Sequence, residues 1–185
     1  MSRIGKKEIL IPIGVTVDLK GQVLTVSGPK GVLEFQLKPG IEVQIGEGKI
    51  LVSRKKEDKF FRALHGTTRQ IINNMIMGVT QGWAKTLELV GTGYRVAPEG
   101  NNLVLSLGFS HKVDFVAPAG ITFSVGESKI IISGISKELV GQTAAKIRQL
   151  RPPDAYKGKG IRYLGELIKL KPGKTAKVGA GIGGK

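Results

Sequence analysis

The sequence predicts an α+β protein of two tandem, duplicated small domains, each an antiparallel sheet with one helix packed on it. Three observations predict this class. The chain repeats itself, glycines separate short segments of alternating apolar and polar residues, and each copy contains one amphipathic segment with helical spacing. Glycine accounts for 27 of 185 residues, about twice the usual ~7%, which is typical of short strands joined by tight turns.

The internal repeat is clearest where residues 39–53 align with residues 119–133, because seven of those fifteen pairs are identical. The same register continues upstream, where Phe35 aligns with Phe115. Two hairpins that converged on the same turn residues are the alternative, but the extent of the match favours a duplicated domain.

The duplication sets the expected domain boundaries. We expect a first α+β repeat domain over residues 1–82 and a second over residues 83–175, which includes a basic extension. Four of the eight residues 178–185 are glycine and the segment cannot build a core, so we expect a flexible, basic, glycine-rich tail over residues 176–185. Gly78–Trp83 is the expected link between the copies.

In the first copy, four segments alternate with a period of two, which predicts strands. They are Val23–Val26, Val32–Leu37, Ile41–Ile45 and Lys49–Ser53. Gly46 and Gly48 indicate a tight turn between the last two. Apolar residues from Phe60 to Met75 then recur at helical spacing, with basic residues between them, so a helix should follow.

The second copy shows the same order of elements. Ser136 is a typical N-cap residue, and an apolar stripe runs from Leu139 to Leu150 at helical spacing. Pro152 and Pro153 should end this helix, because proline cannot continue the backbone hydrogen bonding. Beyond the basic extension, Glu166–Leu170 reads as a final strand.

Composition narrows the possible function classes. The 29 lysines and arginines exceed the 14 aspartates and glutamates, giving a net charge of +15, which indicates a polyanionic partner. The absence of cysteine excludes a disulfide framework, a thiolate zinc site and a cysteine nucleophile. No apolar run reaches the ~18 residues of a membrane span. The N-terminus lacks the apolar core of a signal peptide, so we expect no membrane partner and a role in the compartment of synthesis.

The excess charge is unevenly distributed. Residues 1–82 carry 13 basic and 7 acidic side chains (+6), residues 83–150 carry 7 and 5 (+2), and residues 151–185 carry 9 and 2 (+7). Clustered charge is what a polyanion site requires, whereas a merely soluble protein scatters its charge. The last 35 residues are therefore the leading candidate for partner binding.

The segment 151–163 follows the second helix and has no counterpart in the first copy. Gly158 and Gly160 alternate with Lys157 and Lys159 in this segment. Glycine lets the backbone approach a phosphate chain closely, and the two ammonium groups can reach the phosphates. This pattern favours nucleic-acid binding.

Other side chains of the segment fit the same role. Arg151 and Arg162 offer planar forks for phosphate oxygens, and Tyr156 and Tyr163 can stack on unpaired bases or hydrogen-bond to ribose. A solvated basic loop with inward-packed tyrosines is the alternative. The candidate RNA-binding residues are Arg151, Tyr156, Lys157, Lys159, Arg162, Tyr163, Lys169, Lys171, Lys174 and Lys177, with Arg3, Lys6 and Lys7 as secondary candidates.

The nine residues Pro153-Asp-Ala-Tyr-Lys-Gly-Lys-Gly-Ile161 resemble the signature of the bacterial-type large-subunit ribosomal protein L-six family. Ser2-Arg-Ile-Gly-Lys6, Ala63-Leu-His-Gly-Thr-Thr-Arg69 and Gly91-Thr-Gly-Tyr-Arg95 extend the resemblance over nearly the whole chain. Ala155 stands where many members of the family have proline, which leaves every charge in place.

The resemblance implies a structural constituent of the large ribosomal subunit that supports translation. It implies binding to large-subunit ribosomal RNA near the factor-binding region, close to the sarcin–ricin loop and the stalk base. It also implies neighbouring ribosomal proteins as partners and a place on the ribosome, in the cytoplasm or in an organelle stroma. The second domain would be the principal RNA-binding part.

An enzyme is the first rival interpretation. Gly173-Lys174-Thr175 is similar to a phosphate-binding loop, but Ile168 occupies the position of the earlier glycine of that motif. His65 and His111 lie far in sequence from any carboxylate pair, and the acidic residues lack metal-ligand spacing. We therefore expect no catalysis, cofactor, metal or small-molecule substrate.

A basic DNA-binding or architectural protein is the second rival, because net charge alone does not exclude it. The sequence contains no helix-turn-helix, zinc-finger or basic-zipper pattern. A compact loop of tyrosine, lysine and glycine on a small sheet domain fits a folded RNA better.

Overall fold

The computed structural model describes residues 4–46 and 48–173. The chain divides into two compact units. The first comprises Met1–Trp83 with Gly134–Glu138, and the second comprises Ala84–Ser133 with Leu139–Lys185. Each unit contains antiparallel strands and one long helix, so the predicted α+β class with two repeated units is confirmed.

The first unit distributes its strands over two three-stranded sheets. One has the order β2-β3-β4, from Thr16–Lys20, Val23–Gly28 and Gly31–Gln36. The other has the order β1-β6-β5, from Ile9–Leu10, Lys49–Arg54 and Ile41–Gly46. The four strands predicted from alternation correspond to β3, β4, β5 and β6 and are confirmed.

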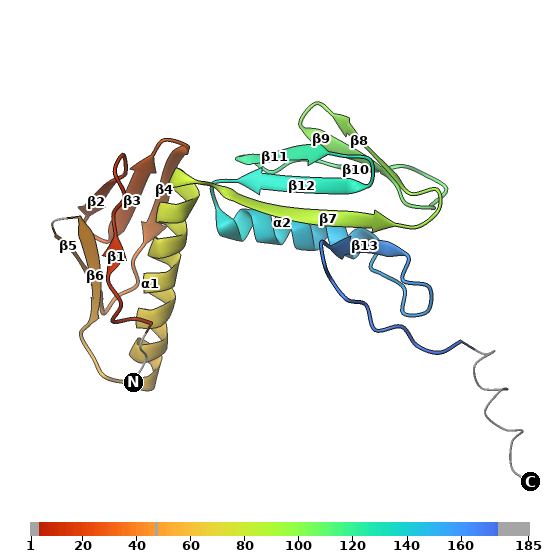
Figure 1. Cartoon of the computed structure of the whole chain (residues 1–185). Coiled ribbons are helices and arrows are strands. Elements are labelled where there is room, and N and C mark those ends of the chain that lie inside the picture. The colour runs from red at the N-terminus through yellow and green to blue at the C-terminus, as the bar shows by residue number, and fades with distance from the viewer. Residues whose placement is uncertain (1–3, 47, 174–185) are drawn as a thin grey trace, which may run out of the picture. The chain divides into compact units, whose positions relative to one another are not determined.

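Helix α1 (Lys59–Thr80) contacts strands of both sheets and lies along them in Figure 1. Its buried side chains recur every three or four residues, as the predicted amphipathic spacing requires. Ile72 and Val79 are fully buried among the side chains of the strands, with Leu24, Val26 and Ile50 opposite. The sheets and the helix therefore share one apolar core.

Gly78 permits a close approach at the end of α1. A Cβ atom there would lie 2.0 Å from the carbonyl oxygen of Ile135, which belongs to the same unit. Nearby, the Trp83 indole donates a hydrogen bond to the Asn74 carbonyl oxygen at 3.1 Å, and the Lys137 ammonium lies 4.4 Å from the Trp83 ring centroid. These contacts explain why residues 134–138 group with the first unit.

The second unit also has two sheets. A three-stranded sheet has the order β10-β9-β8, from Val113–Phe115, Asn102–Ser106 and Arg95–Glu99. A four-stranded sheet has the order β11-β12-β7-β13, from Ile121–Val125, Lys129–Gly134, Trp83–Val90 and Gly160–Tyr163. The hairpins β5–β6 and β11–β12 occupy the two aligned repeat segments, as the duplication predicts.

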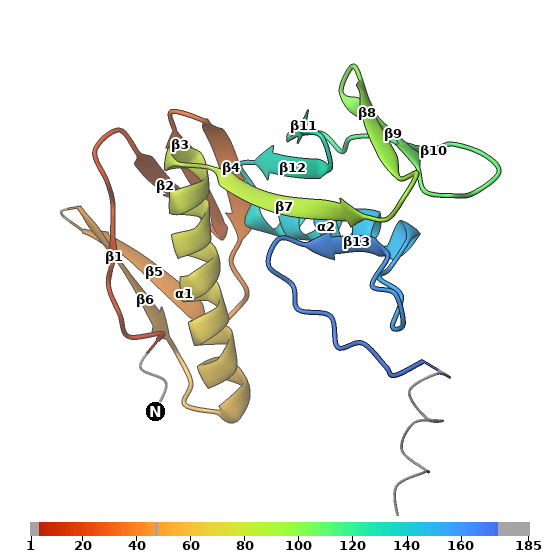
Figure 2. The ribbon, with the colours of Figure 1, turned by 45° about the vertical axis from the view of Figure 1, so that its right-hand side comes forward.

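Helix α2 (Lys137–Leu150) begins directly after Ser136 and ends before the two prolines, as predicted. Figure 2 shows it lying along the four-stranded sheet, where β13 is the neighbour of β7. The fully buried core of this unit includes Leu87, Leu103, Leu105, Leu107, Ile130, Ile132, Ile147 and Ile161.

Two sequence-based expectations differ from the structure. Glu166–Leu170 is not a strand, because the last strand of the described residues is β13 and Leu167 is 95% exposed. Three of its five residues are apolar, but no neighbouring strand pairs with this segment among the described residues. The link between copies is also shorter than predicted, since α1 continues to Thr80 and β7 begins at Trp83.

Candidate nucleic-acid interface

Asp154 folds the segment between α2 and β13 into a compact turn. Its backbone N–H donates to the Lys159 carbonyl oxygen at 2.9 Å, and its own carbonyl oxygen accepts from the Gly158 N–H at 2.9 Å. Its carboxylate oxygen accepts from the Lys157 N–H at 3.0 Å. Asp154 therefore uses three backbone groups of the loop to set its shape, which is a common role for aspartate in turns.

Gly160 allows the two ends of this loop to approach each other closely. Its φ of +150° lies in a region that favours glycine, and a Cβ atom there would lie 2.6 Å from the Pro152 carbonyl oxygen. One residue later, the Ile161 N–H donates to the Arg151 carbonyl oxygen at 2.8 Å, and Ile161 is fully buried. The loop is thus attached to the core at both ends.

Four predicted residues are exposed on this loop: Arg151, Tyr156, Lys157 and Lys159. Tyr156 is 59% exposed, so the alternative of an inward-packed tyrosine is wrong at this position. The structure therefore brings three cations and one aromatic ring together on one loop, residues 151–159.

The other two predicted residues of the segment have partners within the protein. Arg162 is half-buried on β13, and its guanidinium lies 3.2 Å from a carboxylate oxygen of Glu88 on the neighbouring strand. Tyr163 is also half-buried, with the Lys85 ammonium 5.2 Å and the Arg148 guanidinium 5.5 Å from its ring centroid. These side chains belong to the support of the loop.

Glu166 also contributes to the contacts that hold this loop in place. Its carboxylate accepts from Arg148 at 2.5 Å and 3.2 Å and from the Tyr163 backbone N–H at 2.9 Å. The hydrogen bond from Arg148 is the main cause that lowers the pKa of Glu166 below its ordinary value, and the Tyr163 N–H adds to it. The pair links the helix α2 to the chain that follows β13.

The chain after β13 returns to the loop. The Lys171 N–H donates to the Ala155 carbonyl oxygen at 2.8 Å, and Lys169 and Lys171 are both exposed. The predicted residues Lys174 and Lys177, and the expected tail over residues 176–185, lie outside the described residues.

Two further loops lie against residues 151–159, and sequence reasoning did not count them as part of the site. The Arg151 Nε donates to the Tyr94 hydroxyl at 3.2 Å, and the Lys159 ammonium donates to the Thr92 hydroxyl at 3.1 Å. The Arg151 guanidinium also lies 5.0 Å from the ring centroid of Phe109. We call residues 91–95, 108–112 and 151–159 together the three-loop surface.

A pattern in the sequence could have identified these loops. Gly91-Thr-Gly-Tyr-Arg95 and Gly108-Phe-Ser-His-Lys112 each combine glycine, an aromatic residue and a terminal cation. Residues 156–159 combine the same types. Each pattern occurs between strands or next to one, where exposed loops form.

The secondary candidates lie in the first unit. Lys6 and Lys7 are exposed, and Arg3 lies outside the described residues. The buried Arg69 of α1 donates to the carbonyl oxygens of Lys7 at 3.2 Å and Glu8 at 3.1 Å. The structure therefore fixes this N-terminal segment on α1, in a different unit from the three-loop surface.

Neither histidine belongs to a catalytic arrangement within the described residues. The buried His65 donates from Nε2 to the Val52 carbonyl oxygen at 2.7 Å, so its Nδ1 accepts from Arg54 at 3.0 Å. His111 is exposed beside Phe109. Residues 4–46 and 48–173 contain no group of three histidine, cysteine or acidic residues that could hold a metal ion.

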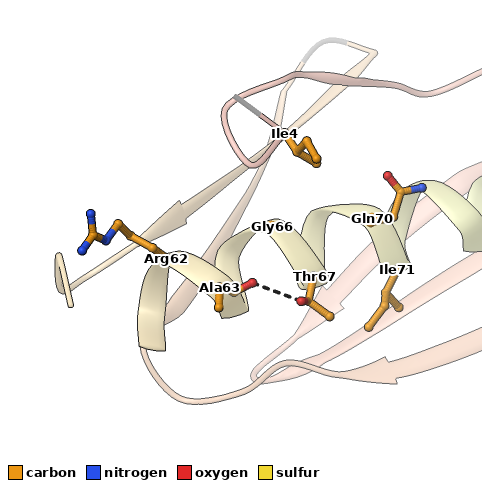
Figure 3. A pocket seen from close by; sticks show the side chains of 7 residues that line it. All are labelled: Ile4, Arg62, Ala63, Gly66, Thr67, Gln70 and Ile71. Atoms are coloured by element: carbon orange, nitrogen blue, oxygen red, sulfur yellow. Dashed lines mark hydrogen bonds between the residues drawn. The ribbon is translucent and has the colours of Figure 1, made fainter. Parts of the chain in front are cut away.

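A pocket on the exposed side of α1 is poor in reactive groups (Figure 3). Its lining includes one charged side chain, Arg62, and the Thr67 hydroxyl donates to the Ala63 carbonyl oxygen of the same helix at 3.0 Å. The lining residues are Ile4, Arg62, Ala63, Gly66, Thr67, Gln70 and Ile71. No acid–base pair is present there. Among the described helices, neither is long and apolar enough to cross a membrane.

Comparison with known proteins identifies the family. The model of the family described as ribosomal protein L6 matches residues 11–82 and 90–164. A protein of Listeria monocytogenes serotype 4a (strain HCC23), called large ribosomal subunit protein uL6, is 54% identical over 178 residues, which cover 96% of this chain and 100% of the relative. A protein of the same name from Phenylobacterium zucineum (strain HLK1) is 54% identical over 94% of this chain and 99% of its own length. Another from Hydrogenobaculum sp. (strain Y04AAS1) is 53% identical over 95% of this chain and 97% of its own length.

These matches confirm the resemblance on which the ribosomal interpretation depends. The family is structural and non-enzymatic, which confirms the expectation that the chain is not an enzyme. Because the matches cover both repeat units at more than half identity, the chain belongs to the ribosomal protein L6 family.

Proposed function

We propose that this chain docks onto large-subunit ribosomal RNA through its second unit, as a structural component of the ribosome that supports translation. The observation that carries the proposal is the exposure of Arg151, Tyr156, Lys157 and Lys159 on one loop whose shape is set by Asp154 and Gly160. Its relatives are named as proteins of the large ribosomal subunit.

Phosphate contacts supply most of the binding in this mechanism. Lys157 and Lys159 project from a turn in which Gly158 presents no side chain, so RNA phosphates can approach the backbone as well as the ammonium groups. Each phosphate neutralised releases counterions, which makes the affinity depend on salt. Contacts of this kind fix position rather than read sequence.

The remaining candidates take different parts. Tyr156 supplies local selectivity by stacking or by a ribose contact. Lys169 and Lys171, with Lys174 and Lys177 after them, extend the positive charge along the RNA. Arg162 and Tyr163 hold the strand that carries the loop, because their side chains already contact Glu88, Lys85 and Arg148.

We place the docking site near the factor-binding region, close to the sarcin–ricin loop and the stalk base. The support for this location is membership of the ribosomal protein L6 family. Neighbouring ribosomal proteins are the expected further partners. The exposed Lys6 and Lys7, with Arg3, provide a secondary RNA contact from the first unit, which otherwise faces protein neighbours or solvent.

Competition binding tests the choice of partner. The full chain is titrated with large-subunit ribosomal RNA while duplex DNA of equal phosphate concentration competes at the same salt concentration. The proposal predicts that most of the protein stays bound to the RNA in the presence of the duplex. Preference for the duplex would instead support the architectural DNA-binding alternative.

A further inference from the structure

The loop 108–112 presents an aromatic ring to solvent. Leu103, Leu105 and Leu107 alternate into the core and are fully buried, so continued alternation would also bury residue 109. Gly108, with φ of +75°, ends the alternation, and Phe109 is 41% exposed. The unit therefore leaves an apolar ring at the surface although its neighbours in the same pattern build the core.

A cation is held beside this ring. The Arg151 guanidinium lies 5.0 Å from the Phe109 ring centroid, within the range of a cation–π contact. The Tyr94 hydroxyl accepts from Arg151 Nε at 3.2 Å and so fixes the guanidinium from another loop. The Tyr94 ring itself lies between two glycines, since Cβ atoms at Gly91 and Gly108 would be 3.1 Å and 3.4 Å from it.

The second aromatic ring of the loop completes the arrangement. The His111 ring stacks with that of Phe109 at a centroid separation of 5.9 Å and an interplanar angle of 16°. His111 is exposed, and so is its neighbour Lys112. Two nearly parallel rings and a fixed arginine thus meet at the surface of the second unit.

We propose that Phe109 is the centre of a stacking platform for an unpaired RNA base, with Arg151 contacting the adjacent phosphate. This inference rests on the proposed RNA-binding function and specifies the kind of RNA element recognised. Only an unpaired base presents its face to an aromatic side chain, because bases inside a duplex stack on each other. The platform therefore selects a loop, bulge or splayed nucleotide over a regular stem.

The charge around the ring favours RNA over a protein partner. Arg151, Lys112 and Lys159 are exposed in the same three-loop surface, and no carboxylate of that surface other than Asp154 is present. Asp154 already accepts a backbone hydrogen bond within its own turn. An acidic protein surface is the competing partner, and the experiment below separates the two.

The test uses the full chain and an in vitro transcript of large-subunit ribosomal RNA. Phe109→Ala and Phe109→Leu should each weaken binding by about 5- to 150-fold, the range for removal of one base–aromatic stack, while the salt dependence stays unchanged. Phe109→Trp should keep the affinity, because its ring can stack. Phe60→Ala is the matched control, since Phe60 is also exposed (67%) but lies in the first unit, and its affinity should equal that of the unaltered chain.

Photo-crosslinking identifies the partner directly. Phe109→p-benzoylphenylalanine, bound to the same transcript, should crosslink to nucleotides that are unpaired. Unchanged affinity in Phe109→Ala, or crosslinks confined to paired nucleotides, would overturn the platform and leave RNA docking by the lysines intact. Failure of the unaltered chain to prefer this RNA over duplex DNA would overturn the proposed function and the platform with it.

Discussion

At the scale of single residues, Asp154 and Gly160 determine how the cations of the loop are presented. Asp154 binds three backbone groups of the turn, and Gly160 leaves room for the Pro152 carbonyl oxygen. Neither residue contributes positive charge. The binding proposed for Lys157 and Lys159 nevertheless depends on both, because a fixed loop loses less conformational entropy when it binds.

Replacing Lys157 and Lys159 together with alanine should weaken RNA binding and reduce the slope of log affinity against log salt by about two, roughly one for each phosphate that is no longer neutralised. Filter binding to large-subunit ribosomal RNA at several salt concentrations measures this slope. The matched control replaces Lys129 and Lys146, which are exposed lysines of the same unit outside the loop. An equal reduction of the slope in both double variants would mean that the loop lysines have no special role.

Gly160→Ala should destabilise the second unit by at least about 2 kcal/mol, because a strained backbone angle is combined with a backbone clash. Urea unfolding gives the free energy. Gly165→Ala is the matched control, since Gly165 also has a positive φ, +77°, but no atom lies within 4 Å of its added Cβ. Its cost should be limited to the ~1–2 kcal/mol of the left-handed conformation. Equal costs for the two variants would refute the clash with Pro152.

At the scale of elements, the sequence predicted the strands and helices better than it predicted the site. Alternation and helical spacing locate β3 to β6, α1 and α2, because burial of one face imposes these periods. The expectation of a strand at Glu166–Leu170 was wrong, because no described strand pairs with this apolar-rich segment. Likewise, Arg162 and Tyr163 are not free on the loop, because β13 begins at Gly160 and places them beside β7.

Long-range contacts explain what sequence reasoning missed. Thr92, Tyr94 and Phe109 are far in sequence from Arg151 and Lys159, and only the folded sheets bring these loops together. Local patterns show that each loop is rich in glycine and aromatic residues, but they do not show which loops meet. The three-loop surface is therefore a product of the fold and not of one motif.

The Arg148–Glu166 pair should make the stability of the second unit sensitive to acid. The pKa of Glu166 is lowered in the folded chain below its ordinary value of 4.5. The ionised Glu166 carboxylate therefore contributes fully to the free energy of unfolding above that value. This contribution is lost as the pH falls through the lower folded pKa. Urea unfolding at several pH values between about pH 6 and pH 3 measures this effect. The free energy of unfolding should fall less for Glu166→Gln than for the unaltered chain over this range. The difference should be no more than ~1 kcal/mol, because the pair is partly exposed. Parallel pH profiles would contradict this.

At the scale of the whole molecule, we propose that the two repeat units have different roles. Both units share the hairpin followed by a helix, but only the second continues into the loop and the lysines that follow. A family of structural proteins uses such folds to present surfaces rather than to catalyse reactions. This difference supports the proposal that the second unit makes the main RNA contact.

Separate fragments test this division. Residues 83–185 should fold alone and keep most of the RNA affinity, because this part contains β7 to β13, α2 and the three-loop surface. Residues 1–82 should bind the same RNA weakly. Circular dichroism establishes folding and filter binding establishes affinity. Equal affinities of the two fragments would place the main RNA-binding surface elsewhere.

Chemical footprinting of large-subunit ribosomal RNA tests the central claim most directly. With the full chain bound, we predict protection of the backbone near the sarcin–ricin loop and the stalk base. The variant with alanine at both loop lysines should lose part of that protection at the same ionic strength. Protection confined to other regions of the RNA, or a footprint that is identical in the two proteins, would contradict the account.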